Sequence, residues 1–313
     1  MRVAGRVLHF LIPLLLCLAV PQATANGVTV ILGEDSAAHA EVAEKLRNAL
    51  SPATAPRTIG KVILLAALRD GDIPQGDVVV AVGTGAMQAL AQRNLNQPLL
   101  NVLVPRAAFD KLVKQGGRAA DPRHFSAVFL DQPWSRQFAL IRLAVPERNR
   151  VGILLGPESA EMANFLRASA KTAGLTAVVE KVNDEGELMP ALKHLLDGCD
   201  VLLASPDPVI FNRNTIQSIL LTAYRRQVPL FGFSPSYVKA GALAAVYSVP
   251  AQIARQAAET IQRLSPEGHL PPPQYPRYYW VGVNAQVARS LSINTEDEPT
   301  LLNKLNQAGE GSP

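Results

Sequence analysis

The sequence predicts an α/β protein of two doubly wound parallel-sheet lobes joined by hinge strands. Three observations predict this class. Short, apolar, β-branched runs alternate with longer runs of helical period, which is the pattern of a parallel sheet covered by helices. Val78–Val82 shows no polar alternation, as expected for a strand covered on both faces. The alternation occurs twice, and residues 26–313 are enough for two domains.

Residues 1–25 have the order of a cleavable secretory signal. Arg2 and Arg6 precede an apolar run over Val7–Val20, and Ala23-Thr24-Ala25 has the small residues of a cleavage site. The apolar run is shorter than the roughly 20 residues that a membrane span needs, so an uncleaved anchor is the weaker alternative. We therefore expect an exported chain that begins at Asn26.

Charge and cysteine usage exclude several classes of function. The formal net charge is +4, but Arg2 and Arg6 lie in the leader, so the exported chain is close to neutral and gives no case for nucleic-acid binding. Cys199 is the one cysteine after the leader, which predicts a buried thiol rather than a disulfide or a nucleophile. No metal site or cofactor is expected, because the histidines have no metal-ligand spacing: His39, His124, His194 and His269.

The elements of the first unit follow a strand-then-helix order. The predicted strands are Val28–Leu32, Lys61–Leu68, Asp77–Val82 and Leu99–Val104. The helices between them include Ala37–Leu50 and Ala86–Arg93.

A second unit begins near a strand over Phe125–Leu130 and repeats the plan. Its further predicted strands are Val151–Leu155, Thr176–Val182, Val201–Ala204 and Leu230–Phe233. Its predicted helices are Ser135–Leu143, Ala160–Ala173, Glu187–Leu196 and Thr215–Arg226.

The last part of the chain connects the lobes again. A short strand over Leu243–Tyr247 precedes an amphipathic helix over Pro250–Leu264, and the proline-rich Ser265–Pro276 predicts an extended crossing segment. A strand over Tyr278–Val283 and a helix over Ala285–Leu291 follow. We place residues 26–130 and about 249–278 in lobe 1, residues 131–248 and about 279–292 in lobe 2, and expect residues 303–313 to be disordered.

Candidate ligand-binding residues follow the strands, because open α/β sheets bind ligands beyond the carboxyl ends of their strands. Gly83-Thr84-Gly85 closes an apolar strand and opens a helix. The backbone N–H groups there, with the Thr84 hydroxyl, can hold a carboxylate or other anion. The alternative is a tight turn in which Thr84 is only the N-cap.

The remaining candidates have similar alternatives. Asp207 can pair with a ligand ammonium or serve as a turn residue, and Trp134 can offer an apolar face or pack in the core. Ser234 and Ser236 can give hydroxyls to a cleft or cap the next turn. Two further candidates lie in loops at strand ends: Gln132 and Ser159.

Catalytic patterns are incomplete, so we do not expect an enzyme. Gly232-Phe233-Ser234-Pro235-Ser236 departs from a nucleophile elbow, since Ser236 replaces the second glycine and Pro235 lacks the N–H that an oxyanion hole needs. Gly83-x-Gly85-x-x-Gln88 lacks the third glycine of a dinucleotide fingerprint.

Several segments, in this order, resemble the ABC-transporter substrate-binding proteins that include tryptophan- and tyrosine-binding members. They are Ala144–Ser159, Asp200–Asp207, Val228–Ser234, Gly241–Ala244, Val283-Asn284 with Ala288, and Ser290-Leu291 with Ile293. The resemblance implies a type I periplasmic-binding-protein fold. It also implies that Thr84 and Asp207 contact ligand from opposite lobes, with Ser234 in another cleft loop. Arg106–Asp131 departs from the family pattern, so the ligand stays open.

The function that the resemblance implies is capture of a small solute in the periplasm for an ABC importer. The lobes would close about the hinge on an amino acid or another small organic solute, and an ABC permease in the inner membrane would be the partner. A periplasmic sensor that presents ligand to a receptor, a secreted α/β enzyme and a scaffold that no longer binds ligand are the alternatives.

Overall fold

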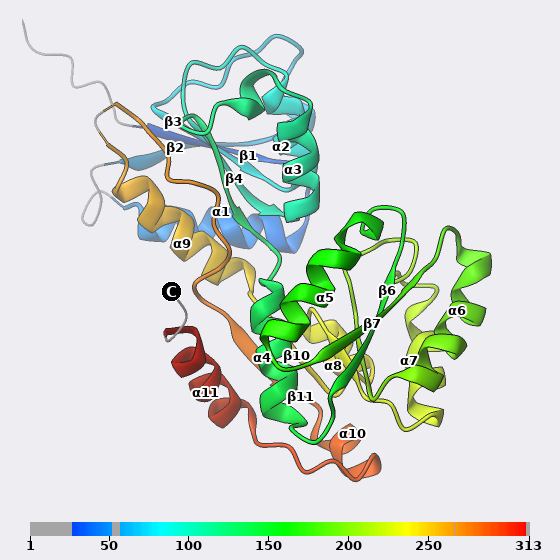
Figure 1. Cartoon of the computed structure of the whole chain (residues 1–313). Helices are drawn as coiled ribbons and strands as arrows, with labels where there is room; N and C mark the ends of the chain where they lie inside the picture. Colours follow the sequence, from blue (N-terminus) through cyan, green and yellow to red (C-terminus); the bar gives the residue numbers. More distant parts are fainter. Residues whose placement is uncertain (1–26, 52–56, 266, 311–313) are drawn as a thin grey trace, which may run out of the picture.

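The computed structural model describes residues 27–51, 57–265 and 267–310 and consists of two α/β lobes (Figure 1). The expected signal segment, residues 1–25, lies outside the described residues. Each lobe has one largely parallel sheet with helices on both faces. The fold class predicted from the sequence is thereby confirmed.

The first sheet is parallel throughout, with the strand order β2-β1-β3-β4-β5. Its strands are β1 (Gly27–Leu32), β2 (Thr58–Leu64), β3 (Val78–Val82), β4 (Leu99–Val104) and β5 (Phe125–Phe129). Every residue of β3 is buried, as its unbroken apolar run predicts. Because β5 pairs with β4, it completes the first sheet, and the prediction that the second unit begins with this strand was wrong.

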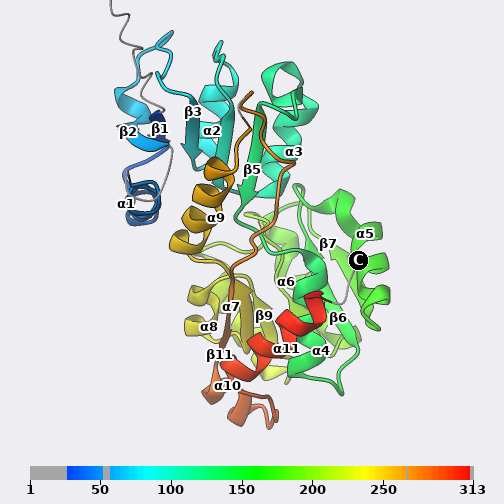
Figure 2. The same ribbon diagram turned by 90° about the vertical axis from the view of Figure 1, so that its left-hand side faces the viewer.

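Two pairs of helices cover the faces of this sheet. They are α1 (Ala37–Ala49) with α9 (Pro250–Gln262) on one face, and α2 (Thr84–Ala91) with α3 (Arg106–Lys114) on the other. α9 packs against α1 and against β4 and β5 (Figure 2), although it follows far later in the sequence. Its apolar spacing explains this, because Ile253, Ala257 and Ile261 lie on one helical face and are fully buried.

The second sheet has the order β11-β10-β9-β8-β6-β7, and only β11 runs antiparallel to its neighbour. Its strands are β6 (Arg150–Leu155), β7 (Thr176–Lys181), β8 (Val201–Leu203), β9 (Leu230–Gly232), β10 (Ala244–Tyr247) and β11 (Trp280–Val283). The order β7-β6-β8-β9-β10 in this sheet matches the order β2-β1-β3-β4-β5 in the first sheet, so both lobes have the same doubly wound topology.

The helices of the second lobe also cover both faces. One face carries α4 (Trp134–Ala144), α5 (Ala163–Thr172), α10 (Ala285–Ser290) and α11 (Glu298–Glu310). The other carries α6 (Glu185–Gly198), α7 (Ile216–Arg225) and α8 (Pro235–Ala240). Asp184 caps α6 by accepting from the backbone N–H groups of Gly186 and Glu187.

The proline-rich segment lies along the outer edge of β5. The N–H of Gln274 donates to the Ala127 carbonyl at 2.8 Å, and the N–H of Phe129 donates to the Gln274 carbonyl at 2.9 Å. The Ser126 hydroxyl donates to the Pro271 carbonyl at 2.6 Å. A proline-rich cover has few N–H groups to offer, so it blocks this edge without extending the sheet.

Two predicted boundaries were wrong. β2 spans Thr58–Leu64 instead of Lys61–Leu68, because the apolar run continues into a 3₁₀ turn over Leu65–Ala67. The tail predicted to be disordered from residue 303 is instead the second half of α11, described to residue 310.

The apolar side chains of α11 explain its order. Leu301 and Leu305 are buried in the core of the second lobe, and α11 packs against α4 and β11. The Glu298 carboxylate accepts from the N–H of Val283 at 2.8 Å, which satisfies an edge donor of β11.

Candidate functional site

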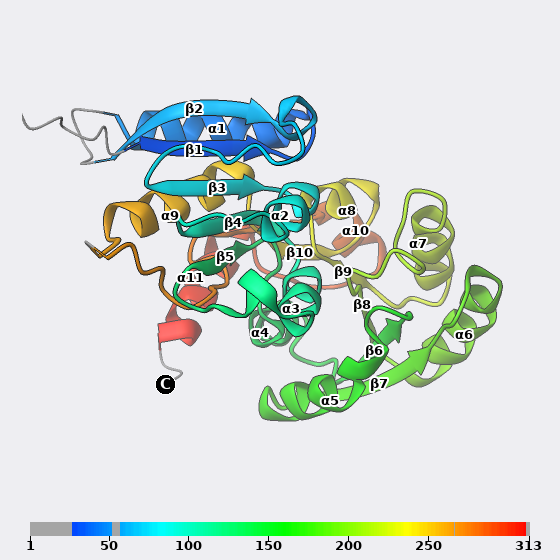
Figure 3. The ribbon, with the colours of Figure 1, turned by 90° about the horizontal axis from the view of Figure 1, so that it is seen from above.

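Each sheet has a topological switch point, where connections leave in opposite directions. In lobe 1 it lies between β1 and β3, and in lobe 2 between β6 and β8. The arrowheads of β2, β3 and β7 point to the same side in the view from above (Figure 3), so the carboxyl ends of both sheets share one side of the molecule. Doubly wound proteins bind ligands at this position. We call residues 33–36, 83–85, 156–159 and 205–209 the switch-point loops.

In lobe 1 the two switch-point loops are held against each other. The N–H of Gly33 donates to the Val82 carbonyl at 2.9 Å, and Gly83 adopts a φ of 86°, which favours glycine. A Cβ on Gly83 would lie 2.6 Å from the ring of the buried His39. The backbone after β3 therefore packs directly on an imidazole from α1.

Thr84 and Gly85 form the first turn of α2, after this contact. The N-cap of α2 is Gly83, and no side chain caps it, so the alternative that Thr84 is the N-cap is wrong. Thr84 is half-buried and Gly85 is exposed. A Cβ on Gly85 would meet no other atom within 4 Å. The first-turn N–H groups and the Thr84 hydroxyl thus lie at the carboxyl end of β3, where a helix favours an anion.

In lobe 2 the switch-point loops are joined by Asp207. Its carboxylate accepts from the Ser159 hydroxyl at 2.8 Å, from the Ser159 N–H at 3.1 Å and from the Val209 N–H at 3.1 Å. The Ser159 hydroxyl oxygen also accepts from the N–H of Gly156 at 3.0 Å. A Cβ on Gly156 would lie 2.3 Å from the Asp207 Oδ1, so only glycine leaves room for this carboxylate.

These contacts give Asp207 and Ser159 a structural role, because they hold the switch-point loops of lobe 2 in place. Asp207 is 1% exposed and Ser159 is 7% exposed, and the Asp207 carboxylate is already bound by three donors. In this structure neither side chain offers a surface to a solute. The geometry supports the alternative that Asp207 is a turn residue over the proposed pairing with a ligand ammonium.

Ser234 and Ser236 lie at the start of α8, after β9. Ser234 occupies the N-cap position with extended backbone, but its side chain makes no capping hydrogen bond. Ser236 is exposed in the first turn. Both lie at the carboxyl end of the second sheet, where the sequence predicts them.

Gln132 lies between the lobes, whereas Trp134 lies in the core of lobe 2. Gln132 is 5% exposed, and its Nε2 donates to the Ser248 hydroxyl at 2.8 Å. Trp134 is buried in the core of the second lobe, where its ring lies 6.5 Å from that of Phe138. These positions support a packed core role for Trp134 rather than an apolar face in a cleft.

An ion pair that the sequence did not indicate links the two lobes. Nζ of Lys114, at the end of α3, lies 3.9 Å from a carboxylate oxygen of Glu161, just before α5. Both side chains are largely exposed, so the pair is screened by solvent and contributes little stability. No spacing in the sequence relates these two positions.

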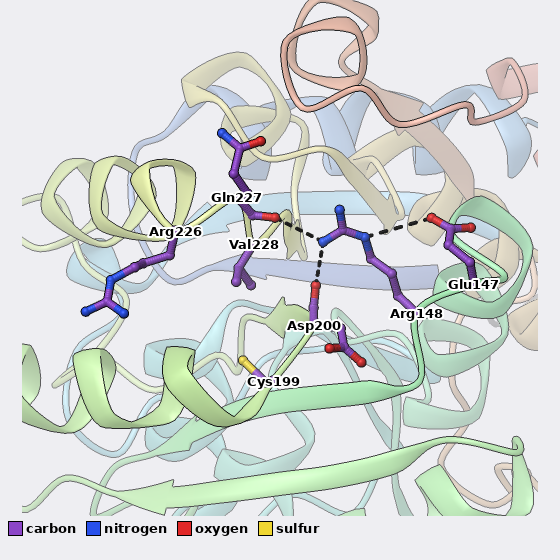
Figure 4. Close-up of a pocket in the computed structure, with 7 residues that line it drawn as sticks. All are labelled: Glu147, Arg148, Cys199, Asp200, Arg226, Gln227 and Val228. Carbon is purple, nitrogen blue, oxygen red and sulfur yellow. Dashed lines mark hydrogen bonds and ion pairs between the residues drawn. The ribbon is translucent and has the colours of Figure 1, made fainter.

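In the described part of the chain, surface cavities also lie at the amino ends of the strands. One of about 310 Å³ is lined by residues before β6, β8 and β9, including Arg148, Cys199 and Asp200 (Figure 4). Another of about 540 Å³ is lined by residues before β3 and β4, including Asp77 and Pro98. Arg148 donates to the carbonyls of Asp200 and Gln227 at 2.8 and 3.0 Å. We assign this guanidinium a structural role, because amino ends of parallel strands are not where doubly wound folds bind ligands.

Cys199 is a buried thiol, and burial raises its pKa to about 11. At pH 8 its thiolate fraction should therefore be about 100-fold below that of an exposed cysteine. We expect an aromatic disulfide reagent to modify the native protein at least 100-fold more slowly than the protein in urea, as followed by thiolate absorbance. Equal rates in both states would contradict this prediction.

Two further features concern the described residues only. No group of histidine, cysteine, aspartate and glutamate side chains there could hold a metal ion. Within the same ranges, every helix is too short or too polar to cross a bilayer.

Two lobes on largely parallel sheets, with switch-point loops on one side, define a type I periplasmic-binding-protein-like fold. A family model described as ABC transporter substrate binding protein matches residues 61–299. The chain belongs to this family, which confirms the resemblance found in the sequence. No curated protein sequence matches the chain.

Solved structures are similar in fold at low sequence identity. An ABC domain in complex with L-Trp from Streptococcus pneumonia is 16% identical, with a TM-score of 0.60 over 90% of this chain and 98% of that one. A substrate-binding protein with adhesive properties from Clostridium difficile, in a ligand-free, open structure, is 15% identical, with a TM-score of 0.65 over 87% and 96%. A conserved domain protein from Vibrio cholerae is 19% identical, with a TM-score of 0.59 over 90% and 98%.

Proposed function

We propose that this protein is the periplasmic solute-binding component of an ABC importer. A small molecule, an amino acid or another small organic solute, binds between the switch-point loops, and the lobes close on it about the hinge. The observation that carries the proposal is the repeated topology, which turns the switch points of both lobes toward one side of the molecule.

The two lobes have different parts in this proposal. Lobe 1 provides Thr84 and Gly85, whose hydroxyl and N–H groups at the start of α2 suit a carboxylate. Lobe 2 provides Ser234 and Ser236 from the turn into α8. Asp207 acts behind this surface by fixing the loops through Ser159 and Val209.

Closure supplies the coupling between binding and transport. A ligand that contacts both lobes favours the closed form by its differential affinity for the two forms. In the described part of the chain, the helices and strands that pack extensively against each other belong to the same lobe, so rotation of one lobe leaves both cores intact. An ABC permease in the inner membrane would receive the closed form.

A periplasmic sensor is the second candidate, because the same capture and closure would serve a membrane receptor equally well. Export through a cleavable segment at residues 1–25 belongs to both proposals. A permease and an ATPase encoded beside this chain would favour import, whereas a neighbouring sensor kinase would favour sensing.

A thermal-shift screen tests the proposal. The mature protein is heated with single amino acids, nucleosides, sugars and small organic acids at 1 mM. A solute present at 100 times its Kd stabilises the native state by about 2.7 kcal/mol, so a true ligand should raise Tm by several degrees. No shift with any solute across the panel would contradict solute capture.

Thr84→Val then tests whether the ligand contacts Thr84 in lobe 1. Removal of a hydroxyl bound to a charged ligand group should weaken the ligand that the screen identifies by about 10- to 100-fold, measured by titration calorimetry. The unliganded Tm should stay unchanged, because no hydrogen bond to the Thr84 side chain is found among the described residues. The matched control is Thr172→Val, an exposed threonine on α5. Parent-like affinity in Thr84→Val would remove Thr84 from the site.

A further inference from the structure

Within the described ranges, three segments cross between the lobes. The first, residues 130–133, joins β5 to α4, and the second, residues 248–249, joins β10 to α9. The third, residues 276–279, leads from the proline-rich segment to β11. Such crossings are where a two-lobed protein absorbs the backbone rotation of closure.

Side chains tie these three crossings to one another. Gln132 Nε2 donates to the Ser248 hydroxyl at 2.8 Å, which joins the first crossing to the second. The Ser248 hydroxyl donates to the Tyr278 carbonyl at 2.6 Å, which joins the second to the third. Arg136, on α4, donates to both Gln132 Oε1 and the Pro276 carbonyl. We call Gln132, Arg136 and Ser248 the hinge tie.

In the third crossing, two adjacent tyrosines are anchored in opposite lobes. The Tyr278 hydroxyl donates to Glu259 of α9 at 2.7 Å, and Arg255 of α9 lies 4.0 Å above its ring. Tyr279 is instead buried in the core of lobe 2, and its hydroxyl donates to Asn306 of α11 at 2.6 Å. The change of lobe therefore occurs between residues 278 and 279.

The first crossing changes lobe between two adjacent residues as well. The Asp131 carboxylate accepts from the backbone N–H of Arg106, at the start of α3 in lobe 1. Gln132 is bound through its side chain to Arg136, on α4 of lobe 2. Burial raises the pKa of Asp131, in keeping with a carboxyl group enclosed at this junction.

We infer that the lobes rotate about an axis that passes between Asp131 and Gln132 and between Tyr278 and Tyr279, and that Gln132 ties the three crossings into one hinge. Three independent crossings would allow twisting and sliding as well as bending. Gln132 of the first crossing bonds Ser248 of the second, and Ser248 and Arg136 bond the Tyr278 and Pro276 carbonyls of the third. Together these bonds restrict the lobes to a single rotation. Gln132 is thus a positioning residue of the hinge, instead of the ligand contact that the sequence predicts.

The hinge tie is well placed to restrict motion. Gln132 is 5% exposed, so water cannot easily replace its lost partners, and buried hydrogen-bond networks act cooperatively. Both polar atoms of its amide are bound, Nε2 to Ser248 and Oε1 to Arg136. An isosteric leucine keeps the volume of this side chain but makes none of these bonds.

Distance measurements between spin labels on the ligand-free protein test the inference. Gln88→Cys on α2 and Lys193→Cys on α6 place labels on exposed positions of opposite lobes, while the native Cys199 is buried and unreactive. Gln132→Leu should broaden the distribution of label-to-label distances about twofold. The matched control is Gln137→Leu, a buried glutamine on α4. Its side-chain amide donates to the Gln132 carbonyl at 3.4 Å, a bond that stays within the first crossing and α4.

A distribution of parent width in Gln132→Leu, or equal broadening in both variants, would overturn the inference. If Gln132→Leu fails to fold by circular dichroism, Ser248→Ala removes the same tie from the second crossing, at a half-buried position. The same broadening is expected there, and an unchanged width would overturn the inference. No ligand enters the experiment, so its outcome is independent of the proposed solute capture.

Discussion

Asp207→Ala should lower the free energy of unfolding by about 3 kcal/mol or more. The substitution removes the acceptor from the Ser159 N–H, the Ser159 hydroxyl and the Val209 N–H, in a loop where Asp207 is 1% exposed. Each buried donor left without a partner costs about 1–3 kcal/mol. Asp207→Asn keeps one carbonyl oxygen and should lose roughly half as much. Urea unfolding followed by circular dichroism measures both.

Replacement of two glycines by alanine provides the matched control for this loss of stability. Gly156→Ala places a Cβ 2.3 Å from the Asp207 Oδ1 and should cost about 1–3 kcal/mol, whereas Gly85→Ala meets no atom within 4 Å and should be neutral or slightly stabilising. In the double variant with Asp207→Ala the Gly156→Ala cost should shrink, because the clashing carboxylate is gone. An Asp207→Ala protein as stable as the parent would show that the carboxylate does not hold these loops.

The fold could be predicted from the sequence because its signals are local. The fully covered strand β3 appears as an unbroken apolar run, and the face of α9 as apolar residues at helical spacing. These patterns depend only on which face of an element is buried, so they can be recognised in the sequence without knowledge of tertiary contacts. The helix α3 was missed although its buried Phe109 and Leu112 lie three residues apart, since two apolar positions in nine residues give a weak period.

The candidate site could be predicted only to the level of loops. The switch-point rule selects the carboxyl edge of each sheet, and Thr84, Asp207 and Ser234 all lie there. It does not give the direction of a side chain, which depends on partners far away in sequence. Asp207 turns to Ser159 of a loop 48 residues earlier, and Gln132 to Ser248, 116 residues later. Such pairings come from the docking of elements, and no short sequence pattern records them.

The glycines at the two switch points show the same limit. Gly83 packs against the ring of His39, and Gly156 against the carboxylate of Asp207. The sequence places each glycine directly after a strand, but the group that fills the space beside it belongs to another segment. The neighbours of these two glycines are chemically different, so comparison of the two lobes' sequences could not have revealed either contact.

Leu301→Ala should lower the free energy of unfolding by about 2–5 kcal/mol, which is the second large effect we expect. Leu301 is fully buried in the core of lobe 2 and Leu305 nearly so, whereas a tail disordered from residue 303 would leave Leu305 in solvent. The tail is mostly polar in sequence, because Asn303 and Lys304 precede Leu305 and Asn306 and Gln307 follow it. At helical spacing, however, Leu301 and Leu305 lie on one face, and that face meets α4 and β11.

Urea unfolding of Leu301→Ala, Leu305→Ala and the double variant measures this contribution. The control is Leu221→Ala on α7, where the leucine is 51% exposed and the expected loss is about 0.5 kcal/mol. The two single losses need not add, because both cavities would open against the same helix. If Leu301→Ala lost no more stability than Leu221→Ala, α11 would not be part of the folded lobe. The Glu298 contact with β11 and the Asn306 contact with Tyr279 would then have no role in holding the end of the third crossing.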